Sequence, residues 1–353
     1  MFLAIKEILH EKVRYGLIVT MVVLTSYLMF LLMGMMFGLA SENTVAIESW
    51  GTKAVVLNKN ANVSLSQSLI APSQLPKLTK HEAELGLVPV VMETVGQKDS
   101  HKTSLQFVGL KEDQFIAKDK LAITSGHRVQ RSNQLVLDES LKDKGYRLGS
   151  KVKFGNSATE YTVVGFAKDA KLNISSIAYG DLSVWQSLRG VGNQFVASGI
   201  ISDQAKPAVT AGLASYSVNT FIEKLPGYSA QNTVFEFMIG FLMVISVIII
   251  AVFLYILTMQ KLANYAVLRA QGIPAQRLIN ATLGQALILM VVGVIIALLL
   301  TVVTGAVLPT AVPMLFNWPL TIGVAVALVV MGVIGALLPV RVIKKIDPLD
   351  ALN

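Results

Sequence analysis

Residues 15–41 read YGLIVTMVVLTSYLMFLLMGMMFGLAS, a run of 27 residues without a charge. A helix crosses the hydrocarbon core of a bilayer with about 20 apolar residues, so this run predicts one membrane span. Two further uncharged runs follow, with 24 residues at 237–260 and 63 residues at 278–340. The longest run has room for two spans, and three prolines between 309 and 319 interrupt it near its middle. The sequence therefore predicts four transmembrane helices, at 15–41, 235–260, 278–308 and 318–341, with a short outer loop at 309–317.

A polar insert of 195 residues, 42–236, separates the first run from the second. Three of its stretches, 134–137, 151–154 and 161–166, are rich in β-forming residues, and 138–144 resembles a short helix. A chain of this length buries enough surface to fold on its own. The predicted fold class is a membrane protein with four transmembrane α-helices and a mixed α/β extracytoplasmic domain, at 42–234, inserted between helices 1 and 2.

The composition agrees with a membrane protein, because 53% of the residues are hydrophobic and only 15% are charged. The net charge of +8 could suggest a nucleic-acid partner, but basic residues in all three short segments that flank the spans give a better account: Lys6, Lys12, Arg14, Lys261, Arg269, Arg277, Arg341, Lys344 and Lys345. By the positive-inside rule these segments are cytoplasmic. The prediction is a multi-pass protein of a bacterial cell membrane with both termini cytoplasmic, a large extracellular domain and no nucleic-acid partner.

The two ends of the chain lie outside the spans. Residues 1–14 have apolar positions at helical spacing, which predicts an amphipathic helix on the cytoplasmic face; a simple extension of the first span fits the pattern equally well. A signal peptide is the less favoured alternative, since its apolar region is much shorter than this run. Residues 342–353 form the cytoplasmic tail.

No catalytic motif is recognised. The chain has no cysteine, its four histidines lack metal-ligand spacing, and no phosphate-binding G-x-x-x-x-G-K-S/T loop occurs. We therefore expect no enzyme activity, no catalytic residue and no intrinsic cofactor. If the protein does energy-driven work, a separate chain must hydrolyse the nucleotide.

The segment 261–277 could receive that chain. Tyr265, Leu268 and Gly272 share one helical face with Arg269 beside it, which predicts an apolar plug with a basic rim. The alternative is an ordinary basic loop between two spans, and the spacing alone does not decide between them.

The outer ends of the first two spans collect thioether, carboxylate and phenol groups. Such groups can ligate haem iron, and methionine surfaces adapt to irregular apolar ligands. The candidate haem contacts are Met29, Met33, Met36, Glu42, Tyr228 and Glu236, with Met36 and Glu236 as possible iron ligands. The alternative is that the methionines fill helix packing and the acidic groups are solvated. Gly34 and Gly38 form a G-x-x-x-G pair that predicts close helix packing at a dimer interface.

The stretch YAVLRAQG at 265–272 resembles the coupling segment of the MacB and FtsX-like ABC transporter permeases. The tail from Pro339 to Leu352 resembles the C-terminal signature of the same family, and 134–166 is similar to its extracytoplasmic core. The first residues, MFLAIKEI, together with the compact insert, make the chain look most like the HrtB-type haem exporter permeases of Gram-positive bacteria.

The resemblance implies a homodimeric permease that works with two copies of a cytoplasmic ABC ATPase. Residues Tyr265, Val267, Leu268, Arg269 and Gly272 then map to the segment that enters the ATPase groove. The expected function is haem export by mechanotransmission, with ATP bound by the partner. Two alternatives are an FtsX-like regulator of a cell-wall hydrolase and a permease that exports drugs or peptides.

Overall fold

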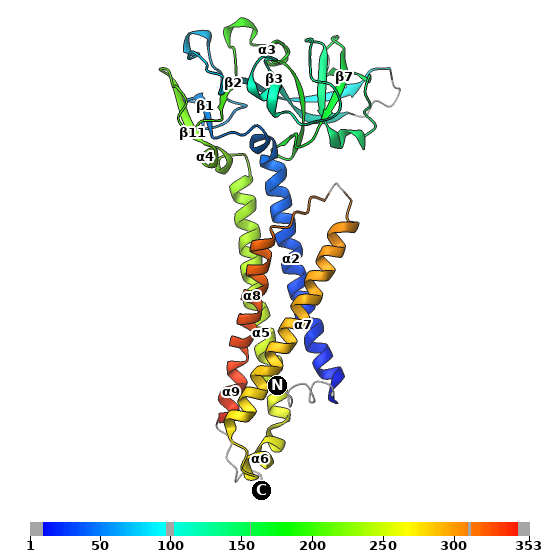
Figure 1. The fold of residues 1–353 in the computed structure, drawn as a ribbon, viewed down its shortest axis with the longest axis vertical. Helices are drawn as coiled ribbons and strands as arrows, with labels where there is room; N and C mark the ends of the chain where they lie inside the picture. The colour runs from blue at the N-terminus through cyan, green and yellow to red at the C-terminus, as the bar shows by residue number, and fades with distance from the viewer. Residues whose placement is uncertain (1–9, 97–101, 156, 310–311, 345–353) are drawn as a thin grey trace. The chain divides into compact units, whose positions relative to one another are not determined.

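A computed structural model describes residues 10–96, 102–155, 157–309 and 312–344. The chain divides into two units: a helical domain, Met1–Gly38 with Asn232–Asn353, and a sheet domain, Leu39–Gln231 (Figure 1). The predicted amphipathic helix at 1–14 and the tail at 342–353 fall largely outside the described residues.

Four helices of the described chain are long and apolar enough to cross a membrane. They are α2 (Lys12–Ser49), α5 (Tyr228–Gln260), α7 (Ala275–Val307) and α8 (Trp318–Gly335), which α9 (Leu337–Lys344) prolongs. A short helix, α6 (Leu262–Ala270), lies between α5 and α7. Their order along the chain is the predicted one, with the sheet domain inserted between the first and the second.

Helices α2 and α5 are longer than the predicted spans at 15–41 and 235–260. The uncharged run marks the part of a helix that can lie in lipid. The helix itself continues until the backbone leaves the helical conformation. That point is Gly51 after α2 and Gly227 before α5, whose φ angles of 72° and 77° lie in the left-handed region that glycine tolerates. The fourth predicted helix, 318–341, is divided at Ala336, because Pro339 has no N–H to continue the hydrogen-bond ladder.

Side chains from four helices form the core of the helical domain. Phe30 and Val22 of α2, Leu254 of α5, Met290 of α7 and Leu328 of α8 are buried in one cluster. Tyr27 and Thr304 join α2 to α7 through a hydrogen bond of 2.9 Å between their hydroxyl groups.

The sheet domain contains eleven strands of the described chain. They are β1 (Ala54–Asn58), β2 (Glu82–Thr94), β3 (Thr103–Leu110), β4 (Ile123–Gly126), β5 (Gln134–Asp138), β6 (Lys151–Phe154), β7 (Tyr161–Ala167), β8 (Lys171–Leu172), β9 (Ser175–Asp181), β10 (Gly199–Ser202) and β11 (Leu213–Ser217). The sheet order is β11-β1-β10-β2-β3-β9-β5-β7-β4, with β8 beside β9. Helices α3 (Leu182–Arg189) and α4 (Val218–Glu223) accompany the strands.

Strand β6 closes part of this sheet into a ring, because it pairs with both β2 and β7. The ring runs β2-β3-β9-β5-β7-β6, and its pairings β3–β9 and β5–β7 are parallel. All six strands contribute to one buried cluster, whose members include Phe107, Phe154 and Phe166. A second cluster contains the end of α2, with Ile47 and Trp50, and parts of β1 and β9.

The sequence located several local elements of this domain correctly. The stretches 134–137, 151–154 and 161–166 all lie in strands, and β6 pairs with β7 in the antiparallel sense. The expected short helix at 138–144 is a 3₁₀-helix at Glu139–Lys142, which Asp138 caps by accepting from the backbone N–H of Ser140.

Candidate functional site

The three methionines of the predicted haem site lie together in the helical domain, but two of them have no free surface. Met29 and Met33 are 0% and 4% exposed and belong to the core cluster of α2, α5, α7 and α8. Met36 is half-buried and packs against the same cluster. Met29 and Met33 therefore pack inside the chain, Met36 keeps an accessible part, and contact of the three methionines with haem stays a prediction.

Gly34 and Gly38 have close contacts within the chain, and their role in dimer packing stays a prediction. A Cβ atom on Gly38 would lie 2.1 Å from the carbonyl oxygen of Pro313, and one on Gly34 would lie 2.9 Å from Cε of Met314. The carbonyl of Gly34 also accepts a hydrogen bond of 3.0 Å from the N–H of Leu315. The absent side chains let the segment before α8 lie directly against α2.

The acidic candidates differ in their surroundings. Glu42, at the start of the sheet domain, forms an ion pair with Lys171, and its backbone carbonyl accepts from the N–H of Ile174. Glu236 on α5 is exposed, and Tyr228, the first residue of α5, is half-buried. Glu42 and Tyr228 belong to the sheet domain, so the six predicted haem contacts do not form one cluster within either unit.

An exposed aromatic pair follows Glu236 on α5. Phe237 and Phe241 are 64% and 65% exposed, and their rings stack with centroids 6.5 Å apart. Val234 and Met238 of the same helix are also exposed. The sequence analysis missed the aromatic pair, although its spacing of four residues places both rings on one helical face.

Helix α6 contains most of the predicted coupling residues, and part of them pack inside the chain. Tyr265 is 4% exposed and packs with Leu278, Val340 and Ile343 in a cluster formed by α6, α7 and α9. Leu268 also packs against this cluster, whereas Val267 is 47% exposed.

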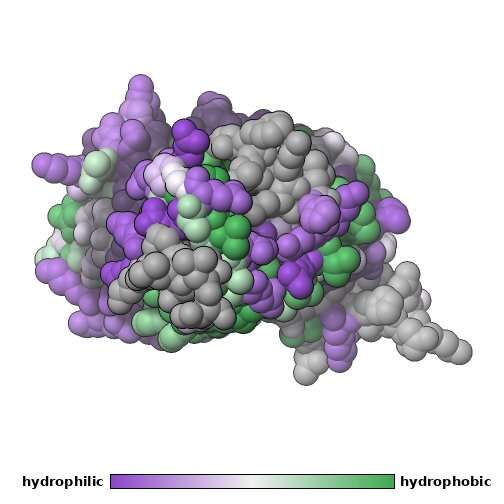
Figure 2. All heavy atoms as spheres, turned by 90° about the horizontal axis from the view of Figure 1, so that it is seen from below, coloured by the Kyte–Doolittle hydropathy of each residue, from purple (hydrophilic) through white to green (hydrophobic). Residues whose placement is uncertain are grey.

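The predicted plug of Tyr265 and Leu268 is thus seated in the chain itself, because burial within the chain removes these apolar groups from water. Gly272 ends the helix region with φ of 86°, and Arg269 is half-buried. The outward face of α6 contains Val267, Asn264 and Ala270. Figure 2, seen from below relative to Figure 1, shows hydrophilic residues interspersed with hydrophobic ones.

A buried lysine at the start of α6 was missed by the sequence analysis. The Nζ of Lys261 donates a hydrogen bond of 3.0 Å to the hydroxyl of Tyr15 and lies 3.7 Å from a carboxylate oxygen of Glu11. Lys261 is 7% exposed. Two features of the sequence could have indicated this pair: a lysine directly follows the apolar run 237–260, and an acidic residue precedes the run 15–41. The contact ties the beginning of α2 to α6.

The helical domain matches a known family model. Residues 236–348, from the second span to the tail, match the C-terminal domain of FtsX-like permeases. The chain carries an FtsX-like permease domain. It is an ABC-type permease with four helices long and apolar enough to cross a membrane, and the predicted resemblance of the 265–272 and tail motifs is confirmed at the level of the family.

Full-length relatives of this permease come from staphylococci. The chain is 27% identical over 353 residues to the proposed hemin transport system permease protein HrtB of two strains of Staphylococcus epidermidis, covering 100% of this chain and 99% of the relative. It is 24% identical over 356 residues to the protein of the same name in Staphylococcus haemolyticus.

Two solved extracytoplasmic domains are similar to part of the permease. The periplasmic region of MacB from Actinobacillus actinomycetemcomitans has 16% identity and a TM-score of 0.35, covering 49% of this chain and 92% of that one. The extracellular domain of the transporter YknZ from Gram-positive bacteria has 13% identity and a TM-score of 0.29, covering 44% of this chain and 84% of that one.

Proposed function

We propose that this permease exports haem from the membrane as a homodimer, driven by two copies of a separate cytoplasmic ABC ATPase. The observation that carries the proposal is the alignment with the staphylococcal proteins named for hemin transport, because it spans both chains almost completely. The match therefore includes the sheet domain and all four spans, and is not confined to the family's shared C-terminal domain.

The exposed beginning of α5 supports a planar apolar cargo. Stacked phenyl rings at Phe237 and Phe241 offer a flat apolar surface, and the exposed carboxylate of Glu236 directly precedes them. Offset stacking between aromatic rings adds about 0.5–1.5 kcal/mol beyond the burial of apolar surface. A carboxylate beside such rings can ligate or hydrogen-bond a polar centre of a macrocycle.

We propose a set of haem contacts that differs from the predicted one, and the accessibility of the side chains supports it. Met36 and Glu236 remain as contacts and possible iron ligands, because both keep accessible surface. Phe237 and Phe241 join them. Met29 and Met33 act through packing, Glu42 is held by Lys171, and Tyr228 stays in reserve.

The proposed ATPase contact is the outward face of α6. A separate ATPase must find an exposed surface, and Val267 is the large apolar residue that α6 presents to solvent. The segment is held by the packing of Tyr265 and Leu268 inside the chain and ends at Gly272, and Arg269 lies at its edge. In this arrangement the partner contacts α6, and α6 passes the movement to α7 and α9 through their shared cluster.

Growth of a deletion strain on hemin, antibiotic and peptide panels tests the proposed cargo. We expect hypersensitivity to hemin that the intact gene restores. Sensitivity to antibiotics or peptides without any to hemin would favour drug or peptide export. A division defect with no hemin phenotype, together with capture of a cell-wall hydrolase by the sheet domain, would favour the regulatory alternative.

Absorption spectra of the purified permease test the proposed contacts. Added hemin should shift the Soret band, and Met36→Ala with Glu236→Ala should reduce that shift. Met259→Ala with Glu223→Ala makes the same changes at other exposed sites and should leave the spectrum unchanged. Identical spectra for the intact protein and the Met36/Glu236 variant would exclude these two residues as contacts.

A further inference from the structure

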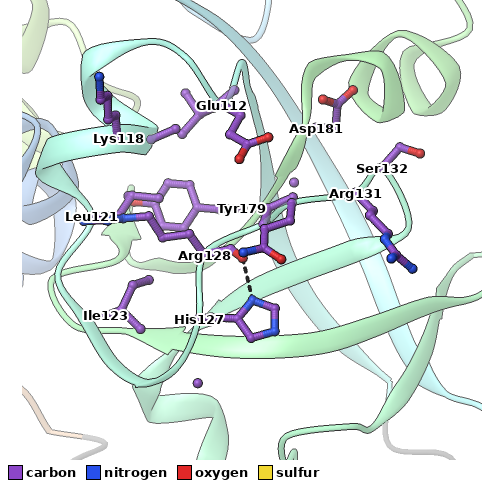
Figure 3. Close-up of a pocket in the computed structure, with 16 residues that line it drawn as sticks. Glu112, Lys118, Leu121, Ile123, His127, Arg128, Arg131, Ser132, Tyr179 and Asp181 are labelled. Atoms are coloured by element: carbon purple, nitrogen blue, oxygen red, sulfur yellow. Dashed lines mark hydrogen bonds between the residues drawn. The ribbon is translucent and has the colours of Figure 1, made fainter.

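The sheet domain contains a cavity of about 640 Å³ that none of the predicted site residues lines. Its walls come from the end of β3, the segment 112–121, β4 with the following loop to Ser132, and the end of β9. Figure 3 shows side chains from these segments around the same space. The volume falls in the range of about 300–1,000 Å³ that is usual for small-molecule sites.

The floor of the cavity is apolar and fixed. Leu110, Leu121 and Tyr179 belong to the second buried cluster of the domain, and Ile123 and Val129 pack against it. The hydroxyl of Tyr179 accepts a hydrogen bond of 3.1 Å from the indole N–H of Trp50, and burial raises the pKa of this phenol. The phenol therefore stays neutral, and the floor offers a rigid, uncharged surface to an apolar ligand.

The rim of the cavity is basic. Lys118, Arg128 and Arg131 line it, and within the described part of the chain these three side chains have no ion-pair or hydrogen-bond partner. Glu112 and Asp181 also line it, but Asp181 is engaged as the cap of α3, where it accepts from the N–H of Ser183. Two exposed guanidinium groups on one loop can bind carboxylates through paired hydrogen bonds.

His127 adds a nitrogen with a defined protonation pattern. Its Nδ1 lies 2.8 Å from the backbone carbonyl oxygen of Arg128, as the dashed line in Figure 3 marks. A carbonyl oxygen can only accept, so Nδ1 carries the hydrogen and the neutral ring keeps its lone pair on Nε2. This is the hydrogen-bonded form in which histidine commonly binds a metal. Among the described residues there is no cluster of three metal-binding side chains.

We infer that this cavity is a second ligand site of the permease, which takes a planar amphipathic dicarboxylate of porphyrin size. The apolar face lies on Leu110, Leu121 and Tyr179, the carboxylates pair with Arg128 and Arg131, and Nε2 of His127 binds iron when the porphyrin carries it. As a site for haem the inference rests on the proposed export function. In this inference the sheet domain has a site that receives or retains the porphyrin, separate from the contacts at Met36 and Glu236.

The test measures binding of metal-free protoporphyrin IX to the full-length permease in lipid nanodiscs, by porphyrin fluorescence. The Met36→Ala, Glu236→Ala variant serves as the background, so that binding at those contacts is removed. In that background we expect saturable binding, and Arg128→Gln with Arg131→Gln should weaken it at least tenfold, because a hydrogen bond to a charged group contributes about 1.5–3 kcal/mol.

Two matched controls isolate the carboxylate pairing. Lys77→Gln with Lys80→Gln removes the same charge from another exposed part of the sheet domain and should leave the affinity unchanged. Protoporphyrin dimethyl ester, which lacks the two carboxylates, should bind the arginine variant and its background equally. Equal affinity of both proteins for protoporphyrin IX itself, or no saturable binding at all, would overturn the inferred site.

Hemin tests the role of His127. In the Met36→Ala, Glu236→Ala background, we expect His127→Ala to reduce the hemin Soret shift. The affinity for protoporphyrin IX should stay within about twofold of that of the background. An unchanged hemin spectrum would exclude His127 as the iron ligand. The outcomes also separate the two proposals: hemin hypersensitivity of the deletion strain tests export, whereas only the Arg128 and Arg131 variants test the cavity.

Discussion

At the residue scale, packing can require a glycine in a helix because a backbone atom of a neighbouring segment lies where a side chain would be. Gly38 leaves room for the carbonyl of Pro313, whereas Gly323 on α8 has no atom within 4 Å of where a Cβ would be. The two glycines look equivalent in sequence, since each lies in an apolar helix. Their replacement by alanine should have opposite effects.

We expect Gly38→Ala to destabilise the helical domain by about 1–3 kcal/mol, the usual cost of adding a group to a packed core. Gly323→Ala should be neutral or slightly stabilising, because alanine favours a helix over glycine by about 1 kcal/mol. Thermal unfolding of both variants in the same detergent measures the difference. Equal midpoints would show that the segment before α8 does not rely on Gly38.

Tyr179 links stability of the sheet domain to pH. Tyr179→Phe leaves the buried indole N–H of Trp50 without its acceptor, which costs about 1–3 kcal/mol. Burial raises the pKa of Tyr179 above its ordinary value of 10.0, so the phenol stays protonated in the folded state while it ionises in the unfolded one. Because of this difference, the free energy of unfolding falls as the pH rises through about 10. The Tyr179→Phe variant should lack this part of the fall.

Unfolding midpoints between pH 7 and pH 11 measure both effects. Tyr216→Phe is the matched control, because the Tyr216 hydroxyl has no partner within the described chain. It should reproduce the parent at pH 7. A Tyr179→Phe protein as stable as the parent at pH 7 would contradict the importance of the Trp50 hydrogen bond.

At the element scale, the sequence predicted which segments are helices better than which face each helix buries. The uncharged runs gave the order and approximate position of four spans, because the absence of charge in lipid is a property of the residues themselves. The direction of α6 could not be derived this way. Tyr265 and Leu268 suit a partner's groove and a cluster of α7 and α9 equally well, and only the three-dimensional arrangement decides between them.

The methionines of α2 illustrate the same limit. Their spacing places Met29, Met33 and Met36 on one face of the helix, but a stripe of methionines suits a ligand and a helix core alike. The outer cavity was missed for a related reason. Its lining comes from segments far apart in the sequence, between Leu110 and Asp181, and sequence spacing does not show that they meet.

Helix α6 provides a test that separates an outward contact from an inward one. Val267→Glu should leave the permease folded but reduce co-purification of its ATPase and raise hemin sensitivity, since Val267 is exposed. Tyr265→Ala should instead lower thermal stability by about 2–4 kcal/mol, because it empties a buried position. Undiminished ATPase binding by Val267→Glu would place the contact elsewhere.

At the scale of the whole molecule, the chain is suited to a direct test of its membrane orientation. It has no cysteine, so a single introduced thiol is the only target for a maleimide. Val209 in the sheet domain and Gln271 between α6 and α7 are both exposed. The positive-inside rule predicts that they lie on opposite sides of the membrane.

We expect Val209→Cys to react with a membrane-impermeant maleimide in intact cells, and Gln271→Cys to react only after permeabilisation. The unmodified chain is the background control and should not react. Labelling of Gln271→Cys in intact cells would reverse the proposed orientation of the termini.

The pairing of β1 has a consequence for the order of events during synthesis. Its partners are β10 and β11, so Val55 pairs with Ile201 and Tyr216, which the ribosome adds about 150 residues later. Until those strands emerge, β1 and the end of α2 have no complete sheet to join, and such distant contacts form slowly. The nascent insert must therefore wait on the far side of the membrane with its first strand open. Chaperones and proteases on the side of the membrane where the insert emerges would meet this protein in that interval.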